Sequence, residues 1–331
     1  MENSHSTSRW LSTHCRKNKT TLKTTTGKVI TRFGADVMVK TKAGETLRCT
    51  AKRKFEQIAC GDNVTIEYQP HGNARVIRLA PRHNVLTRPD FRGRLRNIAA
   101  NIDQVVIVLS WRPEPFWGLV DRYIIAATLL KTNVILVINK SDLAAQYATE
   151  KAKICLEEYR HIGYNIIETS ANKNTESIEG IESTNNAELL TLQQALNHHT
   201  SIFVGQSGVG KSSLAQCLLS EVTIRVGDIS SSGEGQHTTT TSNLYDIPSG
   251  GFLIDSPGVR DYKLPTDISE QALRNGYREF TDYSQQCRFN NCTHQHEPQC
   301  AVRAAYKADT IPPKRYQRYL YLLSALCSGD I

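Results

Sequence analysis

The sequence predicts a multidomain protein with a small N-terminal β-barrel, a central α/β domain and a mainly helical C-terminal domain. Three observations lead to this prediction. Five short runs of β-forming residues, separated by turn pairs, fill residues 24–80. Strands and helices then alternate from Gln104 onward around a glycine-rich loop, and three cysteines and a histidine cluster between residues 287 and 300. At 331 residues the chain can bury two or three separate cores.

The N-terminal third is predicted to hold a basic arm and the barrel. Residues 1–23 have one acidic residue and almost no apolar periodicity, so we expect them to be disordered in isolation. The barrel is predicted over residues 24–81. Its strands are Gly27–Phe33, Ala35–Lys40, Thr46–Cys49, Asn63–Tyr68 and Ala74–Leu79. The strand count and the basic charge fit an OB-fold, which commonly binds RNA, and the main alternative is an SH3-like barrel, which the strand count does not exclude.

Charge is distributed unevenly along the chain. Residues 1–100 hold 20 Lys and Arg against 7 acidic residues, whereas residues 101–331 hold 20 against 25. This asymmetry predicts a polyanionic partner, and nucleic acid fits better than a membrane because no amphipathic basic helix or lipidation signal is present. The alternative is a basic domain that is merely soluble. Residues 82–100 form an arginine-rich linker that either contacts phosphates or is simply solvated.

The region from 101 to 265 is predicted to be a doubly wound α/β domain with a mostly parallel sheet. Its predicted strands are Gln104–Leu109, Asn133–Ile138, Asn165–Glu168 and Ser201–Val204. Its predicted helices are Leu119–Leu130, Glu150–His161, Ala187–Leu196 and Lys211–Leu219. Residues 172–186 are polar and are predicted to form a surface loop.

A phosphate-binding loop is predicted between the strand at 201–204 and the helix that starts at Lys211. The glycines allow backbone N–H groups to turn toward a polyphosphate, and the helix directs its positive dipole end at the same place. Lys211 would reach the β- and γ-phosphates, and the Ser212 hydroxyl would bind Mg²⁺. The predicted phosphate-binding residues are Gly205, Gln206, Ser207, Gly208, Val209, Gly210, Lys211, Ser212 and Ser213.

Two further loops predict that the nucleotide is a guanine nucleotide. Asn139-Lys140-Ser141-Asp142 follows a buried strand, and the Asp142 carboxylate can accept from both N1–H and the 2-amino group of guanine, a donor pair that adenine lacks. Thr169-Ser170-Ala171 follows the next strand and is predicted to contact the guanine O6. An ordinary Asn-containing turn is the alternative for residues 139–142.

Residues after the phosphate loop are predicted to bind Mg²⁺ and sense the γ-phosphate. Asp255-Ser256-Pro257-Gly258 fits an Asp-x-x-Gly element, in which Asp255 binds Mg²⁺ through water and the Gly258 N–H contacts the γ-phosphate. Residues 233–241 have the composition of a first switch loop, with Thr239 as the first candidate for Mg²⁺ and Thr238 as the second. In ordinary GTPases the phosphate loop precedes the Asn-Lys-x-Asp motif, so the order here predicts a circularly permuted P-loop GTPase domain.

The C-terminal region, residues 266–331, contains a predicted structural zinc site. Four ligands complete a tetrahedral Zn²⁺ shell and leave no open position for catalysis. The predicted zinc ligands are Cys287, Cys292, His294 and Cys300, with His296 as an alternative histidine. This segment has few core residues, so metal binding and folding should be coupled. Helices are predicted at Gln271–Phe280 and Pro313–Leu326.

The chain resembles the RsgA family of small-ribosomal-subunit-dependent GTPases over about residues 24–325. The permuted motif order, Gly-Gln-His-Thr-Thr-Thr at 235–240 and the Cys/His spacing at 287–300 produce the resemblance. It implies an OB-fold, a permuted GTPase domain and a zinc domain in which His294 is the ligand. It also implies slow GTP hydrolysis that the small subunit stimulates, and a role in late maturation of that subunit.

A catalytic residue is predicted on the same basis. The position after Asp-x-x-Gly holds Val259, which cannot orient water as the Gln of Ras-type GTPases does. By resemblance His237 is the catalytic candidate, because a neutral imidazole can accept a proton from water or hold it in line. The alternative is that His237 only packs in its loop. Arg260 is either a source of transition-state charge or an ordinary surface residue.

The leading functional prediction is a Mg²⁺-dependent GTPase that binds the 30S subunit and 16S rRNA, as a cytoplasmic monomer without membrane attachment. One alternative is an RNA-docking module for which GTP is a structural ligand, and a weaker one is an ATP-using kinase or ATPase. Near the C-terminus, four basic residues are predicted either to touch rRNA or, preferably, to form a solvated helix face. These residues are Lys307, Lys314, Arg315 and Arg318.

Overall fold

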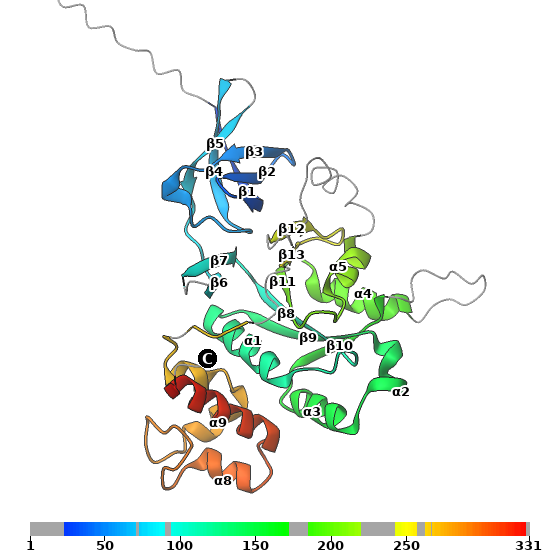
Figure 1. Ribbon diagram of the computed structural model, residues 1–331, viewed down its shortest axis with the longest axis vertical. Helices are drawn as coiled ribbons and strands as arrows, with labels where there is room; N and C mark the ends of the chain where they lie inside the picture. Colours follow the sequence, from blue (N-terminus) through cyan, green and yellow to red (C-terminus); the bar gives the residue numbers. More distant parts are fainter. Residues whose placement is uncertain are drawn as a thin grey trace, which may run out of the picture.

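The computed structural model describes residues 23–70, 73–89, 94–171, 185–219, 242–256, 262–265 and 267–328. It has a β-barrel at one end, an α/β domain in the middle and a helical region at the other end (Figure 1). This arrangement confirms the predicted fold class. Within the described ranges, none of the helices combines the length and the apolar character that crossing a membrane requires.

The barrel closes with the strand order β1-β2-β3-β5-β4 and then back to β1. Its elements are β1 (Thr24–Phe33), β2 (Asp36–Thr41), β3 (Thr46–Thr50), the short 3₁₀ helix η1 (Arg53–Phe55), β4 (Asn63–Tyr68) and β5 (Ala74–Leu79). Strand β5 lies between β3 and β4 and pairs with β3 in parallel, whereas a simple meander would place β4 beside β3. This Greek-key order identifies an OB-fold and excludes the SH3-like alternative.

The barrel core follows from the two-residue periodicity of its strands. Along β1 and β2, alternate side chains are buried, so that Val29, Val37 and Val39 point inward while their neighbours face outward. Gly27 lies where β1 approaches β2 closely, and a Cβ atom there would lie 2.5 Å from the Lys40 carbonyl oxygen. The barrel therefore has its own core, separate from the cores of the α/β domain.

The residues between the barrel and the α/β domain form a hairpin of β6 (Val85–Pro89) and β7 (Leu95–Ala100). The prediction described this stretch only as a linker. The hairpin is fixed to the barrel because the Ala100 N–H donates to the Cys60 carbonyl at 2.8 Å and Arg82 donates to both oxygens of the buried Asp62 at 2.7 Å. The connection between the two domains is therefore structured.

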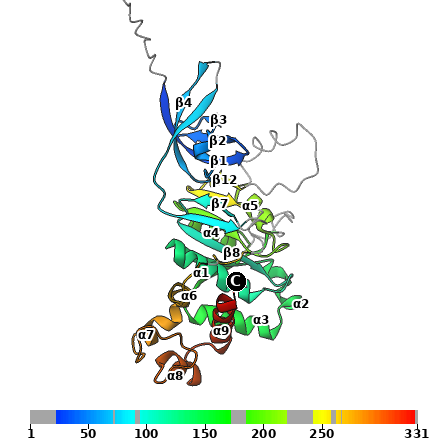
Figure 2. The ribbon, with the colours of Figure 1, turned by 60° about the vertical axis from the view of Figure 1, so that its left-hand side comes forward.

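The central sheet has the order β10-β9-β8-β11-β13-β12, and only the edge strand β12 is antiparallel to its neighbour. This edge strand lies beside β1 of the barrel (Figure 2). The strands of the sheet are β8 (Gln104–Ser110), β9 (Asn133–Asn139), β10 (Asn165–Glu168), β11 (Thr200–Val204), β12 (Asn243–Asp246) and β13 (Phe252–Asp255). From β8 the chain continues outward to β9 and β10 on one side. On the other side, β12 follows β11 in the chain but forms the edge, and β13 then returns to pair with β11. The boundary between β8 and β11 is thus the topological switch point, where such sheets bind ligands.

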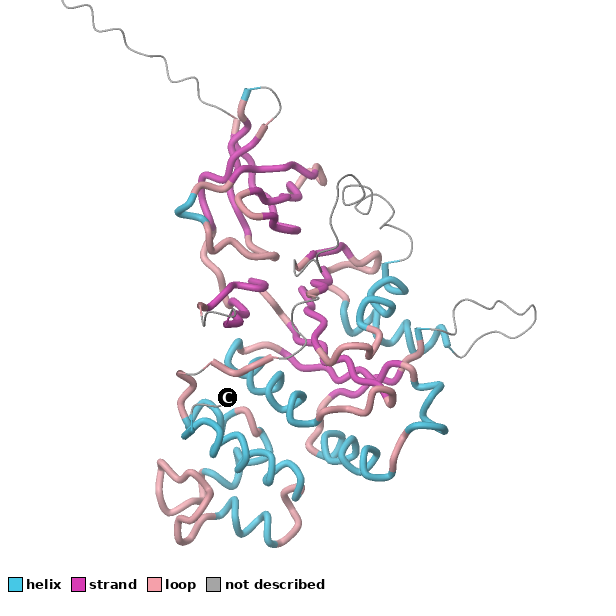
Figure 3. The backbone as a smooth tube through the Cα atoms, viewed as in Figure 1, coloured by secondary structure: helices cyan, strands magenta, loops and turns pink. Residues whose placement is uncertain are grey.

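Helices cover both faces of this sheet (Figure 3). They are α1 (Trp117–Leu130), α2 (Ala144–Tyr147), α3 (Glu150–His161), α4 (Asn185–Leu196) and α5 (Lys211–Leu219), with a 3₁₀ turn η3 (Ser141–Leu143) before α2. Every residue of β8 is buried, because Val105, Ile107 and Leu109 pack toward α1 and α3 while Val106 and Val108 pack toward α4 and α5. Such burial on both faces explains its continuous apolar run.

The C-terminal region contains helices, 3₁₀ turns and loops. Its elements are α6 (Glu270–Asn275), η7 (Arg278–Phe280), α7 (Thr281–Ser284), α8 (Ala301–Lys307) and α9 (Pro313–Ser328). The single helix predicted at Gln271–Phe280 is broken after Asn275. Gly276 packs so closely on α1 that a Cβ atom would lie 2.5 Å from Cγ1 of Ile125. The core of this region is continuous with the side chains of α1 and α3.

The preferred prediction of a solvated helix face near the C-terminus was wrong for two of its four residues. Lys307 and Lys314 are exposed, but Arg315 is fully buried and the side chain of Arg318 is only 17% exposed. Both arginines point toward carboxylates of α1 and neighbouring elements. They hold the C-terminal region on the α/β domain.

Candidate functional site

The phosphate loop, residues 205–213, begins where β11 ends at the switch point of the sheet. Gly205 has a φ of +140°, and a Cβ atom there would lie 2.2 Å from the Val108 carbonyl oxygen of β8. Gly208 and Gly210 also have positive φ values, of 81° and 90°. Only glycine adopts these conformations without strain, so the loop can fold tightly between two buried strands.

Helix α5 starts at the end of this loop with Lys211, which is buried except for 8% of its surface. Its Nζ donates to the carbonyl oxygens of Gly205 at 2.8 Å and Gln206 at 2.7 Å. Ser212 and Ser213 are exposed in the first helical turn. The structure thus brings a lysine, two hydroxyls and a helix N-terminus to one place, which is a geometry suited to a polyphosphate.

Asn139 joins the phosphate loop to the two loops predicted to read the base. It ends β9 and is 1% exposed. Its Nδ2 donates to the Val209 carbonyl at 2.9 Å, and its Oδ1 accepts from the Ala171 N–H at 3.3 Å. A Cβ atom on Gly210 would lie 2.4 Å from this Nδ2. Asn139 therefore positions its neighbouring loops.

The rest of the Asn-Lys-Ser-Asp loop lies over the phosphate loop. Lys140 donates from Nζ to the Gly208 carbonyl at 2.6 Å, and the Ser141 N–H donates to the Thr169 carbonyl at 3.0 Å. Asp142 is exposed and accepts a short hydrogen bond from the Ser170 hydroxyl. The structure brings residues 139–142 and 169–171 together, with the Asp142 carboxylate accessible beside the phosphate loop.

Asp255 is the last residue of β13 and pairs in register with Phe203 of β11, so it lies at the same edge of the sheet as the phosphate loop. The next residue, Ser256, is buried, and its hydroxyl contacts that of Ser242 at 2.9 Å. The remaining predicted residues of this site, His237, Thr239 and Gly258, lie outside the described residues, as do Thr238 and Arg260.

Gln206 makes a contact that the sequence did not predict. Its Oε1 accepts from the Phe116 N–H at 2.7 Å, and its Nε2 lies 3.4 Å from the Glu114 carbonyl. Phe116 is the residue immediately before α1. The side chain thus connects the phosphate loop to the start of α1. No motif in the sequence indicates this pairing, because its partners are backbone groups.

The Cys/His cluster meets the geometric requirements of a zinc site. The ligand atoms of Cys287, Cys292, His294 and Cys300 all lie within 4.8 Å of one another. Nδ1 of His294 lies 3.7 Å from the Cys287 sulfur and 3.4 Å from the Cys300 sulfur, and these two sulfurs are 3.9 Å apart. Zn–S bonds of about 2.3 Å and a Zn–N bond of about 2.0 Å in a tetrahedron require separations close to these.

Neighbouring groups determine the orientation of the His294 ring and the protonation states of His294 and Cys292. Nε2 of His294 lies 3.2 Å from the Ser284 hydroxyl, which leaves Nδ1 facing the sulfurs. Burial and the nearby Arg274 lower the pKa of His294 to about 4, so the imidazole is neutral near pH 7. Burial raises the pKa of Cys292 to about 12, which means that a thiolate there needs a cation. His296, the alternative ligand, is exposed.

The loop that carries His294 is held by several hydrogen bonds. The Glu297 carboxylate accepts from the backbone N–H groups of Thr293 at 2.5 Å and His296 at 3.1 Å. From α9, the Tyr316 hydroxyl donates to the His294 carbonyl at 2.5 Å and the Tyr319 hydroxyl to the Thr293 carbonyl at 2.7 Å. Helix α9 therefore supports the metal loop directly.

The same helix is joined to the α/β domain by a buried ionic network. Arg315 contacts Asp121 of α1 through a short ion pair and binds both oxygens of Glu279 at 2.6 and 3.1 Å. Nε of Arg318 donates to the other oxygen of Asp121 at 2.7 Å, and the Tyr159 hydroxyl also donates to Asp121. Burial alone would lower the pKa of Arg315, but these carboxylates raise it well above its ordinary value.

Together, the fold and these loops define a P-loop GTPase whose motifs are circularly permuted, since the Asn-Lys-x-Asp loop after β9 precedes the phosphate loop after β11 in the chain. A sequence model described as RsgA GTPase matches residues 79–265. The chain therefore belongs to the RsgA family, and like other members it is a GTP hydrolase.

Individual relatives agree with this assignment. A protein from Pseudomonas aeruginosa named small ribosomal subunit biogenesis GTPase RsgA is 40% identical over 306 residues, which cover 92% of this chain and 86% of the relative. A protein of the same name from Hahella chejuensis is 38% identical over 310 residues, covering 92% and 85%.

Two solved structures share the whole arrangement. YjeQ from Thermotoga maritima is 28% identical with a TM-score of 0.71, and the match covers 92% of this chain and 99% of that one. YloQ, described as a circularly permuted GTPase, is 25% identical with a TM-score of 0.68, covering 94% and 98%. The barrel, the permuted sheet and the helical region are therefore a shared arrangement.

Proposed function

We propose that this GTPase binds the small (30S) ribosomal subunit through its 16S rRNA, acts in late maturation of the subunit, and hydrolyses GTP to GDP and phosphate much faster on the subunit than alone. The observation that carries the proposal is the OB-fold barrel fixed to a permuted GTPase domain within one chain. The names of its relatives support the choice of partner. We further propose that it acts in the cytoplasm as a monomer.

Recognition of GTP is assigned to the loops that the structure brings together. Asp142 would accept from the guanine N1–H and 2-amino groups, while Asn139 holds the base loop against the phosphate loop. Residues 205–213 would surround the phosphates with backbone N–H groups, and Lys211 would pair with their charge. The Thr169-Ser170-Ala171 loop would contact the guanine O6.

Mg²⁺ fits the oxygen donors at this edge of the sheet. Ser212 lies in the first turn of α5, Asp255 ends β13, and Thr239 is proposed as a third ligand. When bound, the ion neutralises charge that develops on the phosphates. We assign His237 to hold the attacking water, because Val259 has no group that can do so.

Zn²⁺ is proposed at the cluster of three cysteines and His294, as one structural ion. The four ligands fill a tetrahedral shell, so the ion would stabilise the fold of residues 267–328 and take no part in hydrolysis. The proposed domain limits remain those predicted from the sequence: residues 24–81, 82–100, 101–265 and 266–331.

Replacing His237 by Ala tests whether hydrolysis is the function or GTP is only a structural ligand of an RNA-docking module. We expect His237→Ala to lower subunit-stimulated turnover by at least about 100-fold, the usual contribution of a positioned proton acceptor. Binding of GTP and of 30S subunits should stay within about twofold of wild type. Unchanged turnover would remove His237 from the mechanism.

Competition with ATP tests the remaining alternative, an ATP-using enzyme built on the same phosphate loop. An excess of ATP should fail to displace a fluorescent GTP analogue, because adenine cannot satisfy the Asp142 carboxylate. Displacement by ATP at concentrations similar to those of GTP would contradict the proposed guanine specificity.

A further inference from the structure

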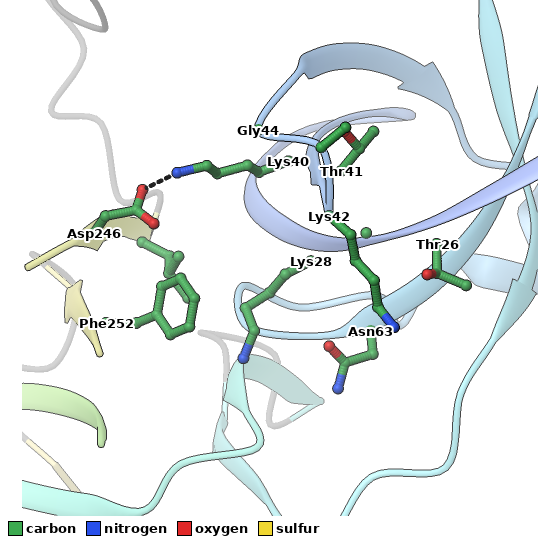
Figure 4. A pocket seen from close by; sticks show the side chains of 12 residues that line it. Thr26, Lys28, Lys40, Thr41, Lys42, Gly44, Asn63, Asp246 and Phe252 are labelled. Atoms are coloured by element: carbon green, nitrogen blue, oxygen red, sulfur yellow. Dashed lines mark hydrogen bonds and ion pairs between the residues drawn. The ribbon is translucent and has the colours of Figure 1, made fainter. Parts of the chain in front are cut away.

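A cavity of about 840 Å³ lies between the barrel and the edge of the α/β sheet, away from the phosphate loop. Strands β1 and β2 of the barrel line one side, and β12 and β13 line the other (Figure 4). Its volume lies within the range of small-ligand sites. Figure 4 shows Lys40 and Lys28 extending from the barrel toward Asp246 and Phe252 of the α/β domain, and Lys42 extending toward Asn63.

The charges around this cavity are mostly positive. Its lining includes three lysines and one carboxylate, Asp246, which is already paired with Lys40 at 2.6 Å. Lys28 and Lys42 therefore supply positive charge that Asp246 does not neutralise. A concave surface with one sign of charge concentrates ions of the opposite sign.

Lys28 is held in an environment that favours an anionic ligand. Its Nζ lies 4.6 Å from the centre of the Phe252 ring, and among the described residues no hydrogen bond from this ammonium is found. Burial lowers the pKa of Lys28, although Asp103 and Cys60 act in the opposite direction. An ammonium that has lost water without gaining a hydrogen-bond acceptor is stabilised when an anion binds.

Uncharged donors complete the lining. The Asn63 amide lies near the end of the Lys42 side chain in Figure 4, and the Thr26 and Thr41 hydroxyls lie on the same wall. Lysines, amides and hydroxyls are the groups that contact phosphate oxygens in proteins. Neither the phosphate loop nor the Cys/His cluster contributes a residue to this cavity.

We propose that this cavity binds the phosphate group of a nucleotide through Lys28, Lys42 and Asn63, at a second site separate from the GTP site. The nucleotide is either a unit of an RNA strand, in which case the inference rests on the proposed RNA partner, or a free mononucleotide. A ligand here touches both the barrel and β12–β13, and β13 ends at Asp255. Occupancy of the cavity thus links the barrel to the strand pair beside the GTP site.

The test measures binding of a fluorescent single-stranded oligoribonucleotide to full-length protein by anisotropy, in the absence of GTP. Combined Lys28→Gln and Lys42→Gln should weaken binding roughly tenfold and reduce the salt slope by about 0.7, because the one phosphate that both lysines contact is no longer neutralised. The matched control combines Lys52→Gln and Lys54→Gln, which remove the same charge from exposed positions of the same barrel.

A second variant distinguishes loss of a ligand contact from loss of folding as the cause of weaker binding. Asp246→Asn removes the cavity carboxylate and releases Lys40, so we expect tighter binding of the oligonucleotide, by about twofold or more. Damaged protein cannot produce such a gain. Equal losses in the two double variants, or no gain in Asp246→Asn, would overturn the proposal.

Titration with AMP distinguishes the two sources of phosphate. AMP is used because adenine lacks the two donors that Asp142 is proposed to bind, so AMP should not bind at the GTP site. Binding of AMP that depends on Lys28 and Lys42 identifies a free-nucleotide site, whereas binding of the oligonucleotide alone identifies an RNA contact. If neither probe depends on these lysines, the inference fails. GTP turnover with 30S subunits is measured separately, so a failure here leaves the proposed function intact.

Discussion

At the scale of single residues, Asn139 and Asp142 illustrate how one short motif performs two different tasks. Asn139 is buried and uses its amide to bind the phosphate loop and residue 171, so its role is structural. Asp142 is exposed and makes a short contact with Ser170. Only the exposed carboxylate has an oxygen available to a base, and Asp142 is therefore the residue that we propose selects guanine.

Replacing Asp142 by Asn should change the preferred nucleotide. The amide can no longer accept from both guanine donors, so we expect affinity for GTP to fall at least about tenfold, equivalent to about 1.4 kcal/mol. Xanthosine triphosphate, which carries a carbonyl in place of the 2-amino group, should bind more tightly to the variant than to wild type. Titration with fluorescent analogues measures both. Unchanged preference for GTP would remove Asp142 from base recognition.

At the scale of elements, helix α9 supports two structures at once. Its arginines hold α1, and its tyrosines hold the loop that carries His294. The start of α1 is in turn bound to the phosphate loop through Phe116 and Gln206. A continuous set of contacts therefore extends from the phosphate loop to the Cys/His cluster.

Removal of the charge at Arg315 should destabilise this junction. Arg315→Met leaves Asp121 and Glu279 buried with fewer partners, so we expect a loss of about 3–5 kcal/mol in the free energy of unfolding. Lys314→Met is the matched control because this adjacent side chain is exposed, and it should cost less than about 0.5 kcal/mol. Urea denaturation measures both. Similar stability in the two variants would contradict the buried network.

Loss of the metal should affect the C-terminal region in particular. We expect one zinc per chain in wild-type protein, retained in His296→Ala and lost in His294→Ala, because only His294 faces the cysteine sulfurs. His294→Ala and a chelator should both make residues 267–328 sensitive to proteolysis. Metal analysis of the purified variants gives the direct answer. Retention of zinc by His294→Ala would assign the ligand to another residue.

The sequence predicted elements well where one face is buried in a regular pattern. Helices α3 and α5 and strands β4 and β5 have the predicted bounds. The β6–β7 hairpin was missed because its many arginines conceal the strand pattern. The burial of Arg315 was also missed, because its partner Asp121 lies 194 residues earlier in the chain. Such contacts depend on tertiary packing, and local periodicity carries no information about them.

The candidate site was easier to predict from the sequence than these contacts, because the residues of a phosphate loop have a fixed spacing. The glycines at 205, 208 and 210 all adopt the backbone conformations that the spacing required. The roles of His237, Thr239 and Gly258 stay predictions, since these residues lie outside the described ranges. Gln206 shows the opposite case, in which a motif residue makes a side-chain contact that no motif specifies.

At the scale of the whole molecule, permutation determines what is attached to each end of the GTPase domain. The barrel enters through β6–β7 into β8, and the helical region follows β13, the strand that ends at Asp255. Both attached regions therefore connect to central strands of the sheet. Binding of a ribosomal particle by either region would act on strands that border the GTP site, which is the physical basis of the proposed stimulation.

The most direct test of this account is GTP and ATP turnover by the purified protein, with and without 30S subunits, at two salt concentrations. We predict slow turnover of GTP alone, a many-fold increase on adding subunits, weaker stimulation at higher salt, and no stimulated turnover of ATP. A GTP turnover that 30S subunits leave unchanged at both salt concentrations would contradict the proposal that the small subunit controls this GTPase.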